Sequence, residues 1–380
     1  MQKKIQQYTP IAILSLVLLI GSAFLFSAQI GRRDPDIYLH SLLSLQQWDR
    51  EVYSHVLYFL LLKIFSGFST DLNDVNRTAI ILLSIATVFK YLVINYILKK
   101  NISHTFYGNR SWIIALISFS LCIIHAIPLG KANFMPGLFT ATNWHNSTII
   151  MQTPLALLQF YLSYQLLIRF SGKSIVLLSI TIILSNLLKP NFFLCFAPIY
   201  TLLIAFECRF RFNTRFLLSV LPVMIGIIIL AIEYWLIYSS GGEGGIGIHF
   251  FLVWDHFITM KWLALLFSFA FPGVYLLLNF SYVKTDKMLV FAWLIVLLGL
   301  LIFIAFYEKG ERMFHANFIW QMVPAMLIPF LTTIINWVKR MDKEGSSLFQ
   351  LKNIICMMVF LIHVLAGCVY IYKVIHYGIS

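Results

Sequence analysis

The stretch "PIAILSLVLLIGSAFLFSAQIGRRDPDIYLH", residues 10–40, combines two features that recur along the whole chain. Residues 10–30 are almost all apolar, and roughly 20 such residues suffice for a helix to cross a bilayer. Residues 31–40 then crowd arginines, aspartates, a tyrosine and a histidine into one short segment. The pattern predicts a membrane-spanning helix that leads directly into a polar segment at the membrane surface.

The composition of the whole chain agrees with this reading. Of the 380 residues, 60% are hydrophobic and only 11% are charged, whereas soluble domains carry about 25% charged residues. The mean hydropathy of +0.85 argues against a single soluble core. A net charge of +13 is explained by basic residues that set membrane topology, rather than by nucleic-acid binding. We therefore predict an all-α polytopic membrane protein with no nucleic-acid partner.

Apolar stretches of spanning length recur along the chain. A long one, residues 174–206, contains Pro190, which lacks a backbone N–H and disfavours helix in the residue before it. We therefore expect two short spans, residues 174–188 and 191–206, that turn at Lys189 and Pro190. The remaining expected spans are residues 10–30, 78–98, 111–128, 148–168, 216–238, 261–282, 288–306, 318–338 and 353–373.

The distribution of basic residues predicts the topology. Residues 52–68 form a shorter apolar stretch, interrupted by His55 and Lys63, that could span the membrane or lie on its surface. If this stretch lies on the outer surface and the N-terminus is cytoplasmic, most of the 28 Lys and Arg residues fall in short inner loops. Because Lys and Arg accumulate in cytoplasmic loops, this bias predicts about eleven spans in one transmembrane domain, residues 1–380, with interfacial helices on the outer face.

Four polar segments are then expected on the outer face: residues 31–76, 130–147, 239–260 and 307–317. They hold most of the 15 Asp and Glu residues. A lone charge buried in a membrane is costly, so such groups usually face a cavity and pair with one another. A carboxylate can take the proton of an attacking hydroxyl, and Arg or Lys can hold a phosphate as its charge grows. Glu233, which is ionisable and lies within a span, is a functional candidate for the same reason.

Each polar segment also has a simpler interpretation when it is taken alone. The "RRDP" sequence at residues 32–35 could merely end the first helix. The "NWHN" sequence at residues 143–146 could be an interfacial tryptophan with polar neighbours, and "GGEGG" at 241–245 could be a flexible loop. The concentration of acids and bases on one face favours the functional interpretation.

The N-terminal part of the chain resembles a known superfamily. The residues that carry the likeness are "DPDIY", Asp34 to Tyr38, then "SHVLYFLLL", Ser54 to Leu62, and Arg77 at the start of the second span. This order resembles the GT-C superfamily of polyprenyl-phosphate-dependent glycosyltransferases over roughly residues 1–98, although "SHVLYF" replaces the usual "PPLYY" and Pro35 splits the usual acid pair. The resemblance implies a GT-C-like fold.

The resemblance also implies a reaction and a set of site residues. An acid of the first outer loop acts as general base, here Asp36 or Asp34, with Asp36 preferred because it is two residues before Tyr38. The acceptor hydroxyl attacks the anomeric carbon in line, which inverts its configuration. The residues expected to bind phosphate or sugar are Arg32, Arg33, Tyr38, Lys189, Lys309, Arg312, Trp144, His145, Asn146 and His315.

The implied partners are a polyprenyl-phosphate-linked sugar, a glycan or glycolipid acceptor, and membrane lipids. The implied location is a bacterial inner membrane, where the protein would contribute to a cell-envelope polysaccharide. No cofactor is required. Asp34, Asp36 and an outer histidine could together ligate a divalent metal, but no residue spacing demands one.

Other functions stay open at the level of sequence. A polymerase or ligase of lipid-linked oligosaccharides would share the many spans and the outer basic residues, but would use a diphosphate-linked donor. A lipid or sugar transporter often has paired halves with broken helices, and the sequence predicts only the break at Lys189–Pro190. A non-catalytic scaffold subunit has no evident need for acids and bases on one face.

Overall fold

The computed structural model describes residues 2–46, 55–102, 111–128, 138–238 and 245–378. About 80% of the chain is helical. Among the described residues, six helices are long and apolar enough to cross a membrane, or seven if one bent pair counts as a single span. The prediction of an all-α, multi-pass membrane protein is therefore confirmed at this level. Parts of three predicted outer loops, residues 47–54, 130–137 and 239–244, lie outside the described residues.

The first half of the described chain consists of helices alone. Several begin with a side-chain cap, in which an Asp, Asn or Ser oxygen accepts a bond from a free N–H of the first turn. Asp71, Asn146 and Ser171 do so at the starts of α5, α7 and α8. The elements are α1 (Gln2–Gly31), α2 (Ile37–Leu45), α4 (Val56–Phe65), α5 (Leu72–Asn101), α6 (Ser111–Ile123), α7 (Ser147–Ile168), α8 (Gly172–Leu188), α9 (Asn191–Glu207) and α10 (Thr214–Tyr238).

The second half adds a short antiparallel ribbon to the helices. Its strands, β1 (Ile246–Ile248) and β2 (Phe306–Glu308), pair with Gly247 opposite Tyr307, and so join two of the predicted outer segments. The other elements are α11 (Leu252–Phe257), α12 (Lys261–Ser268), α13 (Ala270–Leu278), α14 (Phe280–Val283), α15 (Lys287–Ala305), the 3₁₀ helices η1 (Gly310–His315) and η2 (Asn317–Ile319), α16 (Met322–Glu344) and α17 (Leu351–Tyr377).

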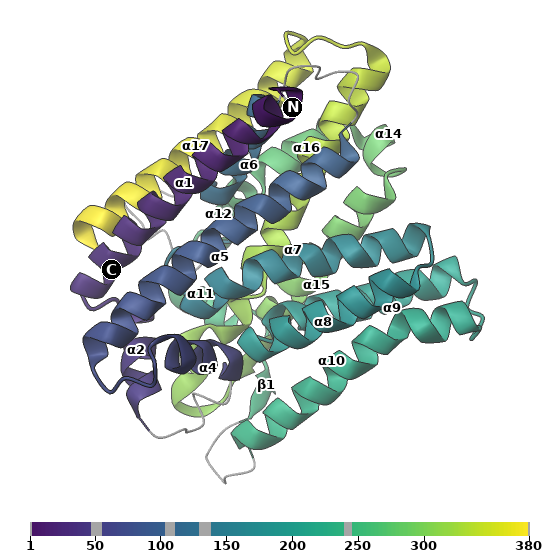
Figure 1. The fold of residues 1–380 in the computed structure, drawn as a ribbon. Coiled ribbons are helices and arrows are strands. Elements are labelled where there is room, and N and C mark those ends of the chain that lie inside the picture. Colours follow the sequence, from purple (N-terminus) through teal and green to yellow (C-terminus); the bar gives the residue numbers. More distant parts are fainter. Residues whose placement is uncertain (1, 47–54, 103–110, 129–137, 239–244, 379–380) are drawn as a thin grey trace.

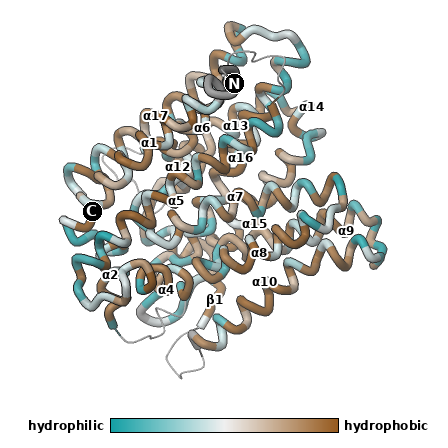
Figure 2. Tube along the Cα trace, in the orientation of Figure 1, coloured by the Kyte–Doolittle hydropathy of each residue, from teal (hydrophilic) through white to brown (hydrophobic). Residues whose placement is uncertain are grey.

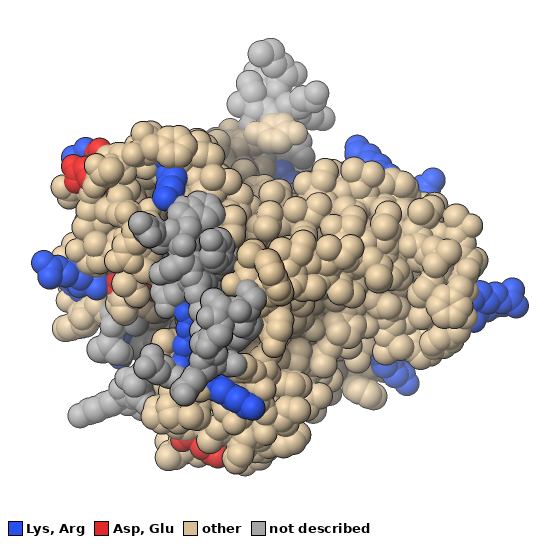
Figure 3. Space-filling view, turned by 90° about the horizontal axis from the view of Figure 1, so that it is seen from below, with Lys and Arg blue, Asp and Glu red and all other residues tan. Residues whose placement is uncertain are grey.

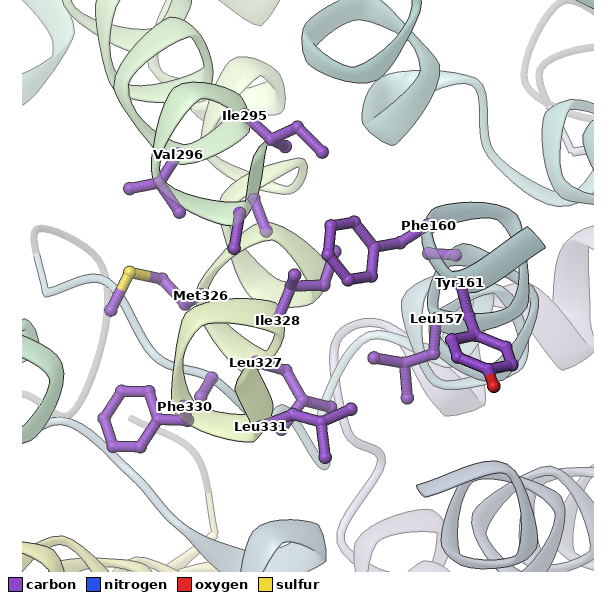
Figure 4. Close-up of a cluster of buried hydrophobic side chains, with 14 of the residues drawn as sticks. Leu157, Phe160, Tyr161, Ile295, Val296, Met326, Leu327, Ile328, Phe330 and Leu331 are labelled. Atoms are coloured by element: carbon purple, nitrogen blue, oxygen red, sulfur yellow. The ribbon is translucent and has the colours of Figure 1, made fainter. Parts of the chain in front are cut away.

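The hydrophobic core surrounds α16. Figure 4 shows Leu327, Ile328 and Leu331 of α16 beside Leu157 and Phe160 of α7, with side chains of α15 on the other side. In the most apolar 18-residue window of residues 312–344, which contain α16, 89% of the residues are buried. The corresponding shares for α1 and α17 are only 28% and 33%. The difference places α16 at the centre and leaves α1 and α17 with broad apolar surfaces, as expected for helices that face lipid.

Polar groups gather at the two ends of the helices. In Figure 1, α2 and α4 lie at the lower left, β1 at the lower centre and the C-terminus at the left, whereas the N-terminus lies at the top and α14 at the upper right. Figure 2 shows hydrophobic residues along α1 and α10 and hydrophilic residues at the helix ends and around α2. In Figure 3 a broad surface without charged side chains separates charged groups at the left and right margins. This surface has the character of a membrane-facing belt.

The structure agrees with some predicted spans and corrects others. The two helices expected to meet at Lys189–Pro190 are present as α8 and α9, each 17 residues long. The stretch 111–128, by contrast, is helical only to Ile123, because the backbone N–H of His125 instead bonds the carbonyl of His363 in α17.

The predicted span 261–282 is broken. Its two helices, α12 and α13, meet at Phe269 with a bend of 73°. Pro272 explains the break, because without an N–H it cannot bond the carbonyl of Ser268 as a continuous helix requires. The prediction that Lys189–Pro190 is the only break in the spans was therefore wrong.

Candidate functional site

The turn after α1 fixes the first acidic pair. Arg33 has a left-handed backbone conformation, φ 56°, which ends the helix. Oδ1 of Asp34 then accepts hydrogen bonds from the backbone N–H groups of Asp36 and Ile37, each at 2.9 Å. An Asp that binds its own backbone in this way builds a tight turn. The turn starts α2 and determines where Asp36 lies.

Asp36 contacts the start of α7, 111 residues further along the chain. Its Oδ1 accepts hydrogen bonds from the backbone N–H of Ser147 at 2.8 Å and from the Ser147 hydroxyl at 2.9 Å. Its Oδ2 accepts one from Nδ2 of Asn146 at 3.0 Å, and Nδ1 of His40 lies 3.4 Å from Oδ1. These bonds join the first predicted polar segment to the second.

Asp34 forms a second link between the same two segments. Nδ1 of His145 lies 3.1 Å from Oδ2 of Asp34. Gln29 reaches the same oxygen at 3.5 Å and also donates to the carbonyl of Trp144 at 2.8 Å. Asp34 is only 4% exposed. Asp34 is therefore a buried residue that fixes the positions of His145 and of the turn.

Lys189 supplies a buried cation at the end of α8. Its ammonium donates to the hydroxyl of Thr148 at 3.3 Å and lies 5.7 Å from the centre of the Trp320 ring. Its backbone carbonyl accepts a bond from Gln152 of α7. The break at Pro190 thus places the lysine between the first turn of α7 and the segment that follows η2.

The fourth polar segment is positioned by β1 and by α9. The backbone N–H of Lys309 donates to the carbonyl of Gly245 at 2.8 Å, which extends the ribbon by one bond. Asn317 donates to Glu308 at 2.8 Å, and its carbonyl accepts a bond from Asn191 of α9 at 2.7 Å. Two 3₁₀ turns, η1 and η2, are thereby fixed next to the start of α9.

These segments enclose one cavity of about 610 Å³. Asp36, His145 and Lys189 lie on its wall together with Arg312 and His315, although they come from four separate parts of the sequence. Part of the lining is apolar, including Leu39, Leu194, Leu230, Phe318 and Trp320. The remaining lining residues are Pro35, His40, His55, Asn146, Pro190, Asn191, Glu233, Tyr234, Glu308 and Asn317.

Electrostatic interactions set the protonation of the polar groups. Burial alone would raise the pKa of Asp36, but the charges of His40, His145 and Lys189 and the N–H of Ser147 together lower it below 3.8. Burial lowers the pKa of Lys189 to about 8, although Asp36 and Glu308 partly oppose the shift. At neutral pH the cavity therefore holds an ionised Asp36 and a charged Lys189.

The His145 imidazole is affected in the opposite direction. Burial would lower the pKa of His145, but the hydrogen bond that His145 donates to Asp34 and the charges of Asp36 and Asp34 outweigh burial and raise it above 6.5. Because the Asp34 contact uses Nδ1, the other ring nitrogen is left for a ligand. The arrangement can donate a hydrogen bond or a proton near neutral pH.

Several predicted site residues do not line this cavity. Arg32 is exposed and donates to the carbonyl of Val374 at 3.4 Å, and Arg33 and Lys309 are exposed outside the cavity. Tyr38 belongs to α2, where its N–H bonds the carbonyl of Asp34. Trp144 is 3% exposed and lies 5.2 Å from the ammonium of Lys90. These five residues therefore lie outside the cavity lining, and the proposal below does not use them.

Sequence reasoning also missed residues in and around the cavity. His40 and Glu308 line it, and Ser147 bonds both Asp36 and His40. None of the three has a motif around it. His40 could have been found from its spacing, since it lies four residues after Asp36 and so shares one face of α2 with it. No comparable signal exists for Ser147.

In the described part of the chain, no group of three or more His, Cys, Asp or Glu side chains is arranged to hold a metal ion. The chain also matches no protein-family model and no curated protein sequence. The cavity and the residues that line it are therefore the basis for a proposed function.

Proposed function

We propose that the protein is a membrane glycosyltransferase that moves a sugar from a polyprenyl-phosphate donor to a glycan or lipid-linked acceptor. The observation that supports this proposal is the cavity, which is lined by Asp36, Lys189 and Arg312 together. A carboxylate can activate a hydroxyl, and cations beside it can stabilise a leaving phosphate. The apolar part of the lining suits a prenyl chain.

The proposed reaction divides these groups by role. Asp36, which is ionised at neutral pH, accepts the proton of the acceptor hydroxyl. The hydroxyl oxygen forms a bond to the anomeric carbon while the bond from that carbon to the phosphate oxygen breaks. Lys189 and Arg312 hold the charge that grows on the departing lipid phosphate. Attack opposite the leaving group inverts the anomeric carbon.

His145 and His315 have positions suited to the sugar. Both line the cavity, and His145 is held through Nδ1 by Asp34. An imidazole fixed in this way presents its second nitrogen in one direction, which suits a hydrogen bond to a ring hydroxyl. Asp34 acts as a positioning residue in this scheme, and Asp36 is the base.

The proposed orientation has the cavity at the outer face of a bacterial inner membrane and the N-terminus in the cytoplasm. The distribution of Lys and Arg supports it, because loops rich in these residues stay on the cytoplasmic side. The acidic groups visible in Figure 3 lie in the left half of the view, whereas the right margin shows only basic groups, which agrees with a difference between the two ends. We retain about eleven spans as the proposed count, with α6 to α9 as short or polar spans.

A donor assay with the purified protein in liposomes tests the function. Two donors distinguish the transferase from a polymerase or ligase: a polyprenyl monophosphate carrying one radiolabelled hexose, and a polyprenyl diphosphate carrying an oligosaccharide. We expect the monophosphate to be consumed and free polyprenyl phosphate to appear when glycan acceptors are present. Consumption of the diphosphate alone would support the polymerase or ligase, and inert protein would contradict both.

Transport is the second candidate, since the bend at Phe269 gives the chain a second broken helix pair. Transporters bind substrate where broken helices meet. Here Pro190 lines the cavity, but the described residues around Phe269 do not. The two breaks therefore do not share a site, and we keep the transferase as the better supported function.

A further inference from the structure

Glu233 lies on the α10 wall of the cavity, where the proposed reaction does not use it. It shares one face of α10 with Gly226, seven residues or about two turns earlier. At Gly226 the helix approaches its neighbours so closely that an added Cβ would lie 2.5 Å from the Phe193 ring of α9. This contact fixes the face that α10 presents, and with it the direction of Glu233. Figure 1 shows α10 beside α8 and α9.

The Glu233 carboxylate has no partner among the described residues. It is 4% exposed, and neither Oε1 nor Oε2 accepts a hydrogen bond from any of them. The other cavity carboxylates differ, because Asp36 is bonded to Ser147 and Glu308 to Asn317. An unpaired carboxylate in an apolar wall is costly. Such a group is expected to be satisfied by something that enters the cavity.

Charge indicates which part of a donor Glu233 would meet. The phosphate is best matched by the two basic residues that line the same cavity, Lys189 and Arg312. The uncharged end of the donor is its sugar, which carries hydroxyl groups on neighbouring ring atoms. The two oxygens of one carboxylate can accept hydrogen bonds from two such hydroxyls at once.

Resting on the proposed function, we propose that Glu233 turns its carboxylate into the cavity and binds a pair of neighbouring hydroxyls on the donor sugar. Glu233 is then a specificity-determining residue that distinguishes sugars by the orientation of those hydroxyls. A site built to bind hydroxyls rejects analogues that lack them, because its own polar atoms are left unpaired. Substrate choice therefore depends on α10 and the proton transfer depends on α2.

Binding of two probes tests this role. The first is a short-chain prenyl phosphate, and the second is the same lipid phosphate carrying a hexose, used as a set with gluco, galacto and manno configurations. In wild-type protein at least one hexose should raise the affinity above that of the bare phosphate. In Glu233→Gln that gain should fall roughly 3- to 10-fold, because an amide nitrogen replaces one of the two carboxyl oxygens and one hydrogen bond from a sugar hydroxyl is lost. Affinity for the bare phosphate should stay within a factor of about two.

The outcomes separate this inference from the function on which it rests. Wild-type protein that binds neither probe overturns the proposed function and this inference together. Wild-type protein that binds the phosphate equally with and without every hexose overturns the sugar role of Glu233, as does a Glu233→Gln variant that keeps the gain. As a matched control, Glu207→Gln removes a carboxylate that pairs with Lys287 at 2.7 Å outside the cavity, and should change neither affinity.

Thermal unfolding of the empty protein provides a second readout. Because Glu233 is unpaired in the described structure, Glu233→Gln should unfold at the same temperature as the wild type or higher. A marked fall in the unfolding temperature would mean that the carboxylate supports the fold, and would overturn the proposal.

Discussion

Asp36 has two roles at the scale of the single residue, since the proposed base also bonds the first residue of α7. We expect Asp36→Asn to lower the transfer rate about 10²–10⁴-fold, because an amide cannot accept the proton. The fold should persist, because the amide oxygen can still accept the bond from Ser147. Product formation from the labelled donor measures the loss, and thermal unfolding checks the fold.

Asp71→Asn is the matched control for that experiment. Asp71 also precedes a helix, where its side chain accepts a bond from the backbone N–H of Asn73, and Asn caps helices as well as Asp does. Asp71 does not line the cavity. The control should therefore retain full activity. Normal turnover by Asp36→Asn would rule out Asp36 as the base.

Lys189 should give the site an alkaline limit. Its pKa is lowered to about 8, so the ammonium is charged at pH 7 and loses its proton as the pH rises through that value. Affinity for a prenyl phosphate should therefore decline between about pH 7 and 9. Lys189→Arg should move the decline to much higher pH, because the guanidinium stays protonated.

The control for the pH experiment is Lys173→Arg, which changes an exposed lysine near the start of α8, away from the cavity. It should reproduce the wild-type profile. The prediction for Lys189 fails if wild-type affinity is constant from pH 7 to 9, or if Lys189→Arg shows the same decline as wild type.

At this scale the sequence indicated some site residues but could not separate them from their neighbours. Asp36, Lys189 and Arg312 were predicted and line the cavity. Arg32 and Arg33 carry the same positive charge as Lys189 and Arg312 and adjoin Asp34. They nevertheless lie outside the cavity, because the chain turns sharply at Arg33. The local sequence shows which residues are charged, but it does not show where their side chains point in the fold.

At the scale of the element, α17 depends on Gly367. A Cβ at this position would lie only 1.7 Å from the backbone carbonyl oxygen of Ile123, at the end of α6. Gly367→Ala should therefore separate α17 from α6 and destabilise the protein by at least about 1–3 kcal/mol, the usual range for overpacking. Thermal unfolding in detergent measures the effect.

Gly21→Ala is the comparison for Gly367→Ala. Gly21 lies within α1 and has no atom within 4 Å of an added Cβ, so the substitution should be neutral or slightly stabilising. If the two variants unfold at the same temperature, α17 does not approach the end of α6 as described.

Helix breaks show where sequence reasoning succeeds at this scale. The break at Pro190 was predicted because the proline interrupts a stretch too long for one span. The break before Pro272 was missed because residues 261–282 have the length of one ordinary span. The early end of α6 was missed because it depends on α17, more than 200 residues later in the sequence.

At the scale of the whole molecule, the proposed function requires the polar segments to open on one side of the membrane. Cysteines introduced at Ser69 and Lys309 should react with a membrane-impermeant maleimide on intact cells. Cysteines at Ser171 and Asn213 should react only after permeabilisation, because α7 and α9 lead away from the cavity to these residues.

The native cysteines should interfere little with this labelling. Cys122, Cys195, Cys208 and Cys356 are buried, and the exposed Cys368 can be replaced by serine before labelling. If positions 69 and 309 label from opposite sides, their segments cannot border one compartment and the transferase proposal is withdrawn.

The overall class was accessible from composition, because 60% hydrophobic residues leave few alternatives to a membrane protein. The sequence predicted that polar segments from several parts of the chain meet in one chamber, but it did not predict which residues line it. The cavity is lined by Asp36, His145, Lys189 and Arg312, among others. Its geometry rests on particular bonds, such as Asp36 to Ser147, that no local pattern encodes.

If the proposed transfer reaction takes place, the bonds between Asp36 and Ser147 change in strength during each turnover. If Asp36 takes up a proton, its oxygens become weaker acceptors, so the link between the first loop and α7 is loosest just after the sugar has moved. Loss of the proton restores that link and resets the loop. Release of the product and recovery of the starting state would then both depend on the charge of the Asp36 carboxyl group.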